Sequence, residues 1–395
     1  MKKMYSRILL LAIMVLTMAS CRIEPPLNLP SEDVVIENPI IVNELEVIWD
    51  IDVSWKIDWV YEWDEEDSAN WGPIAYPEPT RYNVYRFFLG ELPGVSHAYA
   101  KTDGPFEIRT NRFERKYNFG WYDILIYSLI DSPDFTQNLI VDDSDLDDVI
   151  AYTHSRSVRM YRPKAGLSSI PLYNQPEIFY SAFNTDIHIT HDPNDYDYFD
   201  EERKVWVKKL ESILNPLVYI YLVQVILHHN NGRVVKVPEV CAIDGLADKT
   251  SVTFGNTSEN DVSVNFPMRL KQALDAKKYL KPDEKTCDVI GGKLTTFGLC
   301  GMPPWVRSRS AAYVGSRADV KNNFALNMQF ANGTDSTYYY NVTDQFQSRA
   351  HGGVITVEID VDTLKIPVNP RPPGGGSGFD PYVAPYDTVV HEFNM

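Results

Sequence analysis

The amino-acid sequence predicts an all-β protein built from two tandem antiparallel β-sandwich domains with one short helix. The clearest observation is the segment 45–59, in which apolar side chains at odd positions alternate with mostly polar ones at even positions. This period of two predicts a strand with one apolar face, which a second sheet must cover. Short β-prone runs separated by turn residues continue along the chain, and 395 residues are too many for one compact core.

The first twenty residues have the pattern of a secretory signal peptide. An apolar segment, 8–16, follows the positively charged residues Lys2, Lys3 and Arg7. A charged region followed by a hydrophobic one is typical of such signals. The apolar segment is too short to span a bilayer, so we expect residues 1–20 to be removed.

The signal ends with Ala19 and Ser20, which Cys21 follows. Signal peptidases need small side chains beside the cut, and a lipoprotein needs a thiol at its new N-terminus to carry the lipid. These residues predict cleavage before Cys21 and lipidation of Cys21, which would anchor the protein to a membrane. The alternative is an ordinary signal peptide in which Cys21 is incidental.

The mature chain is strongly acidic. The full chain has a formal net charge of −17. Removal of the signal takes away three positive charges and no negative ones, which leaves the mature chain at −20. Negative surfaces repel phosphate groups, so we expect no nucleic-acid partner and no binding to anionic lipid.

The region before the second domain is expected to comprise a tether and one sandwich. Residues 21–43 contain several prolines and no periodicity, which predicts a tether. The first domain is expected at 44–200, and the polar segment 192–202 marks its predicted end. Further strands are expected at 82–89, 106–109, 120–130, 149–153, 178–182 and 186–190.

The second sandwich is expected at 201–370. Its segment 217–227 is strongly apolar, which predicts a strand that is buried on both faces or crosses between sheets. The residues 230–232, Asn-Asn-Gly, predict a hairpin turn with 234–237 as the returning strand. Residues 268–279 are the one predicted helix. The other expected strands are 205–214, 251–254, 262–266, 294–299, 324–330, 338–342 and 354–361.

The last part of the chain, 371–395, is a Pro/Gly linker followed by a tail with strand-forming residues. A linker of this composition packs against nothing. A strand-capable segment at its end can add to the sheet of a neighbouring protein. Val389, Val390 and Phe393 are the candidate residues for this strand addition.

No motif nominates a catalytic or metal site. His188 and His191 are three residues apart, so on a strand they point to opposite faces. The acidic run 142–148 lacks the glycine and the closing glutamate of a calcium loop. We therefore expect no enzyme activity, no metal, and no cofactor beyond the covalent lipid on Cys21.

The remaining cysteines form no complete disulfide framework. Cys287 and Cys300 could pair, whereas Cys241 lies in an apolar context and is expected to be a small buried residue.

Several short motifs resemble those of the fimbrillin-like lipoproteins of Bacteroidales. The main one is 241–247, Cys-Ala-Ile-Asp-Gly-Leu-Ala, which 251–255, Ser-Val-Thr-Phe-Gly, follows. The other matching segments are 122–127, 296–298, 341–345, 352–357 and 366–367. The resemblance extends over most of the mature chain and rests on the order of these motifs together with Cys21.

This resemblance implies two transthyretin-like sandwiches, an outer-membrane location, and a role in pili or cell adhesion with other pilus subunits as partners. In the family, polymerising subunits are cut after an arginine beyond the lipidated N-terminus, whereas anchor subunits stay lipidated. Here Arg22 is the only arginine of the tether. The resemblance therefore implies an anchor or assembly role.

Two alternatives belong to other functional classes. One is a surface glycan-binding lipoprotein, in which Trp63 or Trp71 would stack on sugar rings. The other is a lipid-anchored glycosidase, for which no motif nominates a pair of carboxylates.

Overall fold

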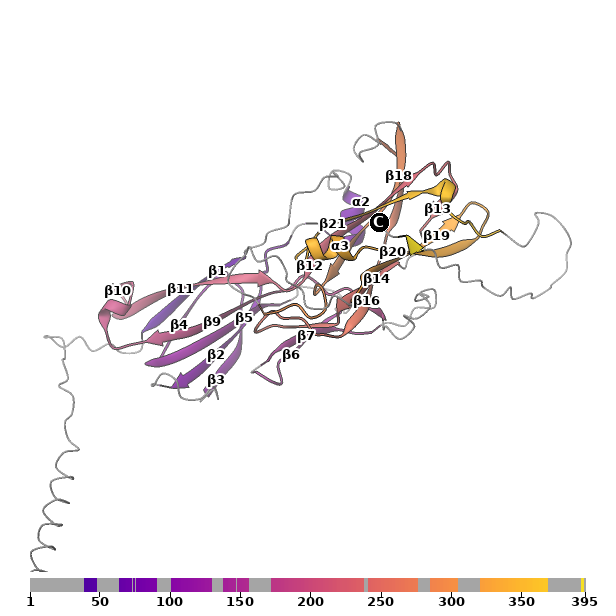
Figure 1. The fold of residues 1–395 in the computed structure, drawn as a ribbon. Coiled ribbons are helices and arrows are strands. Elements are labelled where there is room, and N and C mark those ends of the chain that lie inside the picture. The colour runs from indigo at the N-terminus through magenta and orange to yellow at the C-terminus, as the bar shows by residue number, and fades with distance from the viewer. Residues whose placement is uncertain are drawn as a thin grey trace, which may run out of the picture.

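The computed structural model describes residues 39–47, 64–72, 74, 76–90, 101–129, 138–146, 148–155, 172–237, 241–275, 285–304, 320–368 and 392–393. Strands dominate these residues, which confirms the predicted all-β class (Figure 1). Their two α-helices are short, α2 (Glu65–Trp71) and α3 (Thr343–Ser348). Within this part of the chain, no helix combines the length and apolar character needed to cross a bilayer.

The first domain is built on one continuous path of hydrogen-bonded strands, β3-β2-β5-β9-β11-β1-β4, with β10 also paired to β11. The strand β11 meets β9 only through its last two residues, Asn215 and Pro216. The path folds over there, because Ile41 and Phe113 of one half share a core with Val84 and Ile124 of the other. The strands are β1 (Ile40–Val47), β2 (Tyr82–Gly90), β3 (Lys101–Ile108), β4 (Arg112–Lys116), β5 (Gly120–Ser128), β9 (Tyr180–Ile189), β10 (Tyr198–Asp200) and β11 (Val205–Pro216).

The strand β5 is covered on both faces. Ile124 and Ile126 enter the core inside the sandwich, whereas Leu125 and Tyr127 enter a second core. A three-stranded sheet supplies part of that second core, in the order β15-β7-β6. Its strands are β6 (Leu139–Asp142), β7 (Ile150–Thr153) and β15 (Lys249–Ser251).

The second domain packs a four-stranded sheet, β17-β18-β12-β21, against a larger sheet, β22-β20-β19-β14-β16-β8, with β13 paired to β19. Side chains of both sheets form its main core, for example Val223, Val225, Ile243 and Phe324. The strands are β8 (Leu172–Tyr173), β12 (Tyr219–His228), β13 (Val234–Lys236), β14 (Cys241–Ala247), β16 (Asp261–Phe266), β17 (Arg269–Asp275), β18 (Thr286–Thr296), β19 (Asn323–Phe330), β20 (Asp335–Asn341), β21 (Gly353–Asp360) and β22 (Glu392–Phe393).

The predicted buried strand is β12, and all ten of its residues are buried. Val223 and Val225 enter the main core, while Leu222 and Ile226 pack on the opposite face of the sheet. Burial on both faces is therefore confirmed as the reason for the apolar run.

The predicted hairpin after β12 is wrong. The strand β12 pairs with β18 and β21, whereas β13 pairs with β19 in the facing sheet. Positive φ values at His229, Asn231 and Gly232 do form a tight turn. This turn carries the chain across the sandwich instead of back along the same sheet.

The predicted helix at 268–279 is also wrong, because residues Arg269–Asp275 form β17. Leu270 and Leu274 have the spacing of a helix face, but the strand contains a bulge between Lys271 and Leu274 with Ala273 at φ 57°. The extra residue of a bulge reverses the alternation of side chains. Leu270 accordingly packs on the main core and Leu274 on the outer one.

Both ends of the predicted first domain shift. The strand β1 begins at Ile40, inside the expected tether 21–43, and the expected strand 45–59 is described only to residue 47. At the other end, β11 pairs within the same sheet as β9 and β1, so the strands of that sheet continue to Pro216, beyond residue 200.

Three short segments link the two domains. The helix α2 precedes β2 in sequence, yet its buried Asp67 is bound by Arg269 and Lys271 of β17, and the distance from Lys271 Nζ to Asp67 Oδ2 is 2.6 Å. The strand β8 pairs with β16, and β15 pairs with β7. The two domains therefore exchange elements.

Candidate functional site

The strand β20 lies near one edge of the larger sheet of the second domain. It pairs antiparallel with β19 along all seven of its residues, from Asp335 to Asn341. On its other side lies β22, which runs parallel to it and matches Glu392 with Tyr339 and Phe393 with Tyr340. Figure 1 shows this short yellow strand against the sheet. The tail thus pairs with two of the seven residues of β20.

Two of the three consecutive tyrosines of β20 hold it in place. Tyr338 and Tyr340 enter the main core, and the hydroxyl of Tyr338 donates a hydrogen bond to the Lys365 carbonyl at 3.0 Å. Burial raises the pKa of Tyr338 to about 12 and the pKa of Tyr340 further. Both side chains are neutral and fixed in the core, so the strand presents its backbone edge from a rigid, uncharged support.

The predicted strand-addition residues are only partly described. Phe393 belongs to β22, whereas Val389, Val390 and the lipidation residue Cys21 lie outside the described residues. Sequence reasoning identified the tail but missed the strand to which it pairs. The run of tyrosines at 338–340 predicts a strand, but a sequence pattern does not reveal which strand lies at an edge.

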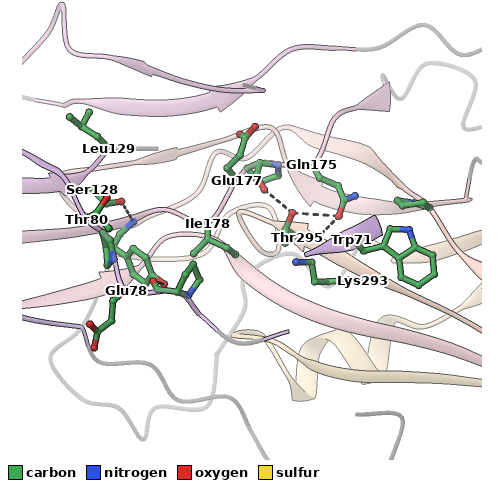
Figure 2. Close-up of a pocket in the computed structure, with 15 residues that line it drawn as sticks. Trp71, Glu78, Thr80, Ser128, Leu129, Gln175, Glu177, Ile178, Lys293 and Thr295 are labelled. Carbon is green, nitrogen blue, oxygen red and sulfur yellow. Dashed lines mark hydrogen bonds between the residues drawn. The ribbon is translucent and has the colours of Figure 1, made fainter. Parts of the chain in front are cut away.

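A second feature is a pocket of about 540 Å³ where the two domains meet (Figure 2). Tyr180 and Ser128 line it from the first domain, and Lys293 and Thr295 line it from β18. Thr295 ties the walls together, because its backbone N–H donates to Gln175 Oε1 at 2.7 Å and its hydroxyl donates to the Pro176 carbonyl at 2.7 Å.

Of the two tryptophans proposed for sugar binding, the described one, Trp71, does not offer both faces of its ring. Trp71 lines the pocket, but the guanidinium carbon of Arg269 lies 5.5 Å from its ring centroid, so one face of the indole is already occupied. Trp63 lies outside the described residues. Lys293 is largely buried in the same pocket, and this burial lowers its pKa to about 8.

The two histidines considered above as metal ligands, His188 and His191, pack against different aromatic rings. The ring of His188 stacks on Trp121, with centroids 4.1 Å apart, and the ring of His191 packs on Phe119 at 3.6 Å. In the acidic run, Asp142 accepts from the Ser144 amide instead of turning toward a shared centre.

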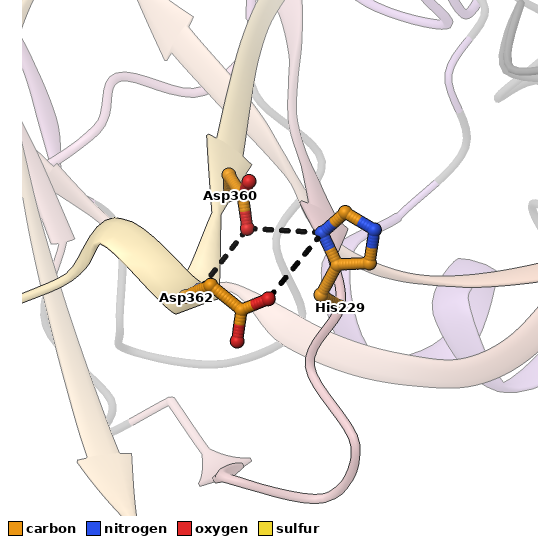
Figure 3. Close-up of side chains that lie close together, drawn as sticks. All are labelled: His229, Asp360 and Asp362. Carbon is orange, nitrogen blue, oxygen red and sulfur yellow. Dashed lines mark hydrogen bonds and ion pairs between the residues drawn. The ribbon is translucent and has the colours of Figure 1, made fainter.

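A different histidine does meet carboxylates. His229 Nδ1 lies 3.0 Å from Asp360 Oδ1 and 3.8 Å from Asp362 Oδ2, on one surface of the second domain (Figure 3). Sequence reasoning missed this group, because more than a hundred residues separate His229 from the two aspartates.

The three described cysteines are Cys241, Cys287 and Cys300. Cys241 is completely buried, as predicted, and burial raises the pKa of its thiol to about 12. Among the described residues, no disulfide joins Cys287 and Cys300. The two sulfur atoms could not meet in this fold, because Cys287 packs in the outer core of β12 and Cys300 in the second core of the first domain.

No protein-family model matches the sequence, and a search of curated proteins finds no match. Among solved structures, the chain is similar to a candidate adhesin from Bacteroides ovatus, with 14% identity, a TM-score of 0.44, and coverage of 82% of this chain and 93% of that one. For a candidate adhesin from Bacteroides thetaiotaomicron the values are 10%, 0.43, 84% and 94%. For the fimbrial anchor protein Mfa2 from Porphyromonas gingivalis they are 12%, 0.34, 82% and 91%.

Proposed function

We propose that this chain is a lipid-anchored protein of the outer membrane that anchors a pilus or starts its assembly. In this proposal the tail strand pairs with β20 of its own chain, as here, or adds to the corresponding edge of a neighbouring pilus subunit, and the protein has no enzymatic role. The observation that carries the proposal is the pairing of the tail strand β22 with β20.

The edge of β20 suits strand addition for a physical reason. A strand at the edge of a sheet presents backbone N–H and C=O groups that a further strand can satisfy, and side chains on alternate positions then set the register. Among the described residues, the tail satisfies this edge at Tyr339 and Tyr340. The segment Asp335–Tyr338 therefore offers backbone groups that β22 does not pair with.

The sequence supports the location. Cys21 follows a signal-like segment, and Arg22 is the only arginine between it and β1 at Ile40. Arg22 lies immediately beside the residue that would carry the lipid, and the rest of the tether up to Ile40 offers no arginine for a later cut, so the lipid would be retained. The residues between Cys21 and Ile40 would reach at most ~60 Å in a fully extended chain.

The tail provides the test. Phe393→Asp places a charge in the segment that pairs with β20, and Asn394→Asp adds the same charge one residue later. In cells that make the pilus, we expect Phe393→Asp to reduce co-purification with other subunits by about tenfold, the effect of ~1.4 kcal/mol in binding. We expect Asn394→Asp to co-purify with other subunits as the wild type does. The melting temperature of the purified protein should be the same for both variants.

Two outcomes would contradict the proposal. Unchanged co-purification of Phe393→Asp would mean that the tail takes no part in assembly. A melting temperature lowered by several degrees would mean that β22 is an ordinary core strand. Acyl labelling tests the anchor separately, because Cys21→Ala should abolish the labelling, whereas inhibition of lipoprotein signal peptidase should leave a labelled precursor that retains residues 1–20.

A further inference from the structure

The surface around His229 places three metal-binding side chains at the ends of two neighbouring strands. The strands β12 and β21 run parallel, and their register pairs His228 with Asp360. His229, the first residue after β12, therefore lies beside the end of β21. Beyond Asp360 the chain enters the 3₁₀ helix η4 (Val361–Thr363), which brings Asp362 to the same side.

The distances within this group fit one small cation. Zn²⁺ binds imidazole nitrogen and carboxylate oxygen at about 2.0–2.2 Å in a tetrahedron, which sets neighbouring ligand atoms about 3.4 Å apart. The two distances from His229 Nδ1, 3.0 Å to Asp360 and 3.8 Å to Asp362, lie on either side of this value. All three potential ligand atoms lie within 4.8 Å of one another.

Backbone and side-chain contacts fix the three residues before any ion binds. Asp360 caps η4 by accepting the backbone N–H of Asp362 at 3.0 Å. The guanidinium of Arg233 holds Asp362 Oδ1 at 2.6 Å, which leaves Oδ2 on the side of His229. Arg233 also donates to the carbonyl of His229, and Asn231 donates to the same carbonyl at 3.3 Å. Groups that orient ligands in this way strengthen metal sites.

We propose that His229, Asp360 and Asp362 bind a divalent first-row transition ion such as Zn²⁺. His229 would coordinate through Nδ1, which releases any proton from that nitrogen and leaves one on Nε2. The three side chains are partly exposed, with side-chain exposures of 53%, 42% and 60%, so water fills the remaining position. The nitrogen ligand favours such an ion over Ca²⁺, which prefers six to eight oxygen atoms.

Calorimetric titration of the untagged full-length protein with Zn²⁺ tests this proposal. We expect one ion per chain, with affinity lowered at least ~tenfold in His229→Ala and Asp360→Asn. His154→Ala is the control, since His154 is an exposed histidine of the first domain. Ca²⁺ should give no heat at the same concentrations. Circular dichroism establishes that each variant is folded.

The visible spectrum of bound Co²⁺ gives a second measurement that needs no variant. A four-coordinate site gives intense d–d bands, whereas an ion held by water alone gives weak ones. The proposal is overturned if His229→Ala binds Zn²⁺ as tightly as the wild type, if His154→Ala lowers the affinity equally, or if Co²⁺ gives only the weak spectrum.

Discussion

Lys293 shows at the residue scale how a contact between distant segments sets a chemical property. It lies on β18 and lines the pocket with Pro77, Pro176 and Pro267. Burial lowers its pKa from the usual 10.5 to about 8. The sequence predicts neither effect, because the walls of the pocket come from parts of the chain far from Lys293. By contrast, the burial of Cys241 was predictable from its apolar neighbours alone.

The lowered pKa of Lys293 makes stability depend on pH in a defined direction. Between about pH 8 and 10.5 the unfolded chain binds this proton and the folded protein does not, so stability rises with pH in that window. Below pH 8 both states carry the charge, and the folded protein bears the cost of its burial.

Lys293→Met removes that charge at similar volume. We expect it to raise the free energy of unfolding at pH 7 by about 1–3 kcal/mol, an advantage that shrinks toward zero as the pH approaches 10.5. Urea unfolding of both proteins at several pH values measures the difference. Buried tyrosines titrate alike in the two proteins and cancel in it. A difference that is constant with pH would contradict this account.

At the scale of elements, the sequence predicts strands better than it predicts their partners. Most expected strands exist, among them those in β2, β5, β12, β16, β19 and β21, because alternation or continuous apolar character records which faces are buried. The partners depend on long-range packing, so the Asn-Asn-Gly turn after β12 is correct while its hairpin is wrong. The error at β17 has another cause. Leu270 and Leu274 have the sequence spacing of a helix face, and the bulge between them lets a strand place them on opposite faces.

A substitution at Ala273, which lies in that bulge, tests whether this segment is a strand or a helix. Its φ of 57° is a left-handed conformation that strains any residue with a Cβ atom. We expect Ala273→Gly to raise the free energy of unfolding by about 0.5–1 kcal/mol, measured by urea denaturation. In a helix the same substitution would lower it by ~1 kcal/mol, so the sign of the change decides between the two structures.

At the scale of the whole molecule, short elements of each domain pair with the other one. Two sandwiches are predictable from chain length and strand patterns, but the crossing of α2, β8 and β15 is not, because these elements are short and carry weak patterns. The candidate site shows the same division. The tail could be recognised from its composition, whereas its partner β20 depends on the order of strands in the sheet.

The contact of α2 with β17 predicts coupling between the domains. Asp67→Ala would remove the buried carboxylate that binds both Arg269 and Lys271, while the exposed Asp64 still faces both cations, and we expect a cost of about 2 kcal/mol. The exposed Glu65 on the same helix is the control, and Glu65→Ala should change stability by less than ~0.5 kcal/mol. Calorimetry should show one transition for the wild type. Equal effects of the two substitutions would contradict the coupling.

The parallel pairing of β1 with β11 determines how the protein would respond to pulling. The tether leads into the start of β1 at Ile40, and the end of β11 at Pro216 leads into the second domain. Under the proposed function, a tensile force between membrane and pilus would therefore act on opposite ends of two parallel strands and load their eight residue pairs in shear. Hydrogen bonds loaded in shear must break together, whereas bonds that are peeled open break one at a time. In a protein anchored as proposed, β1 thus lies in the geometry that resists traction best.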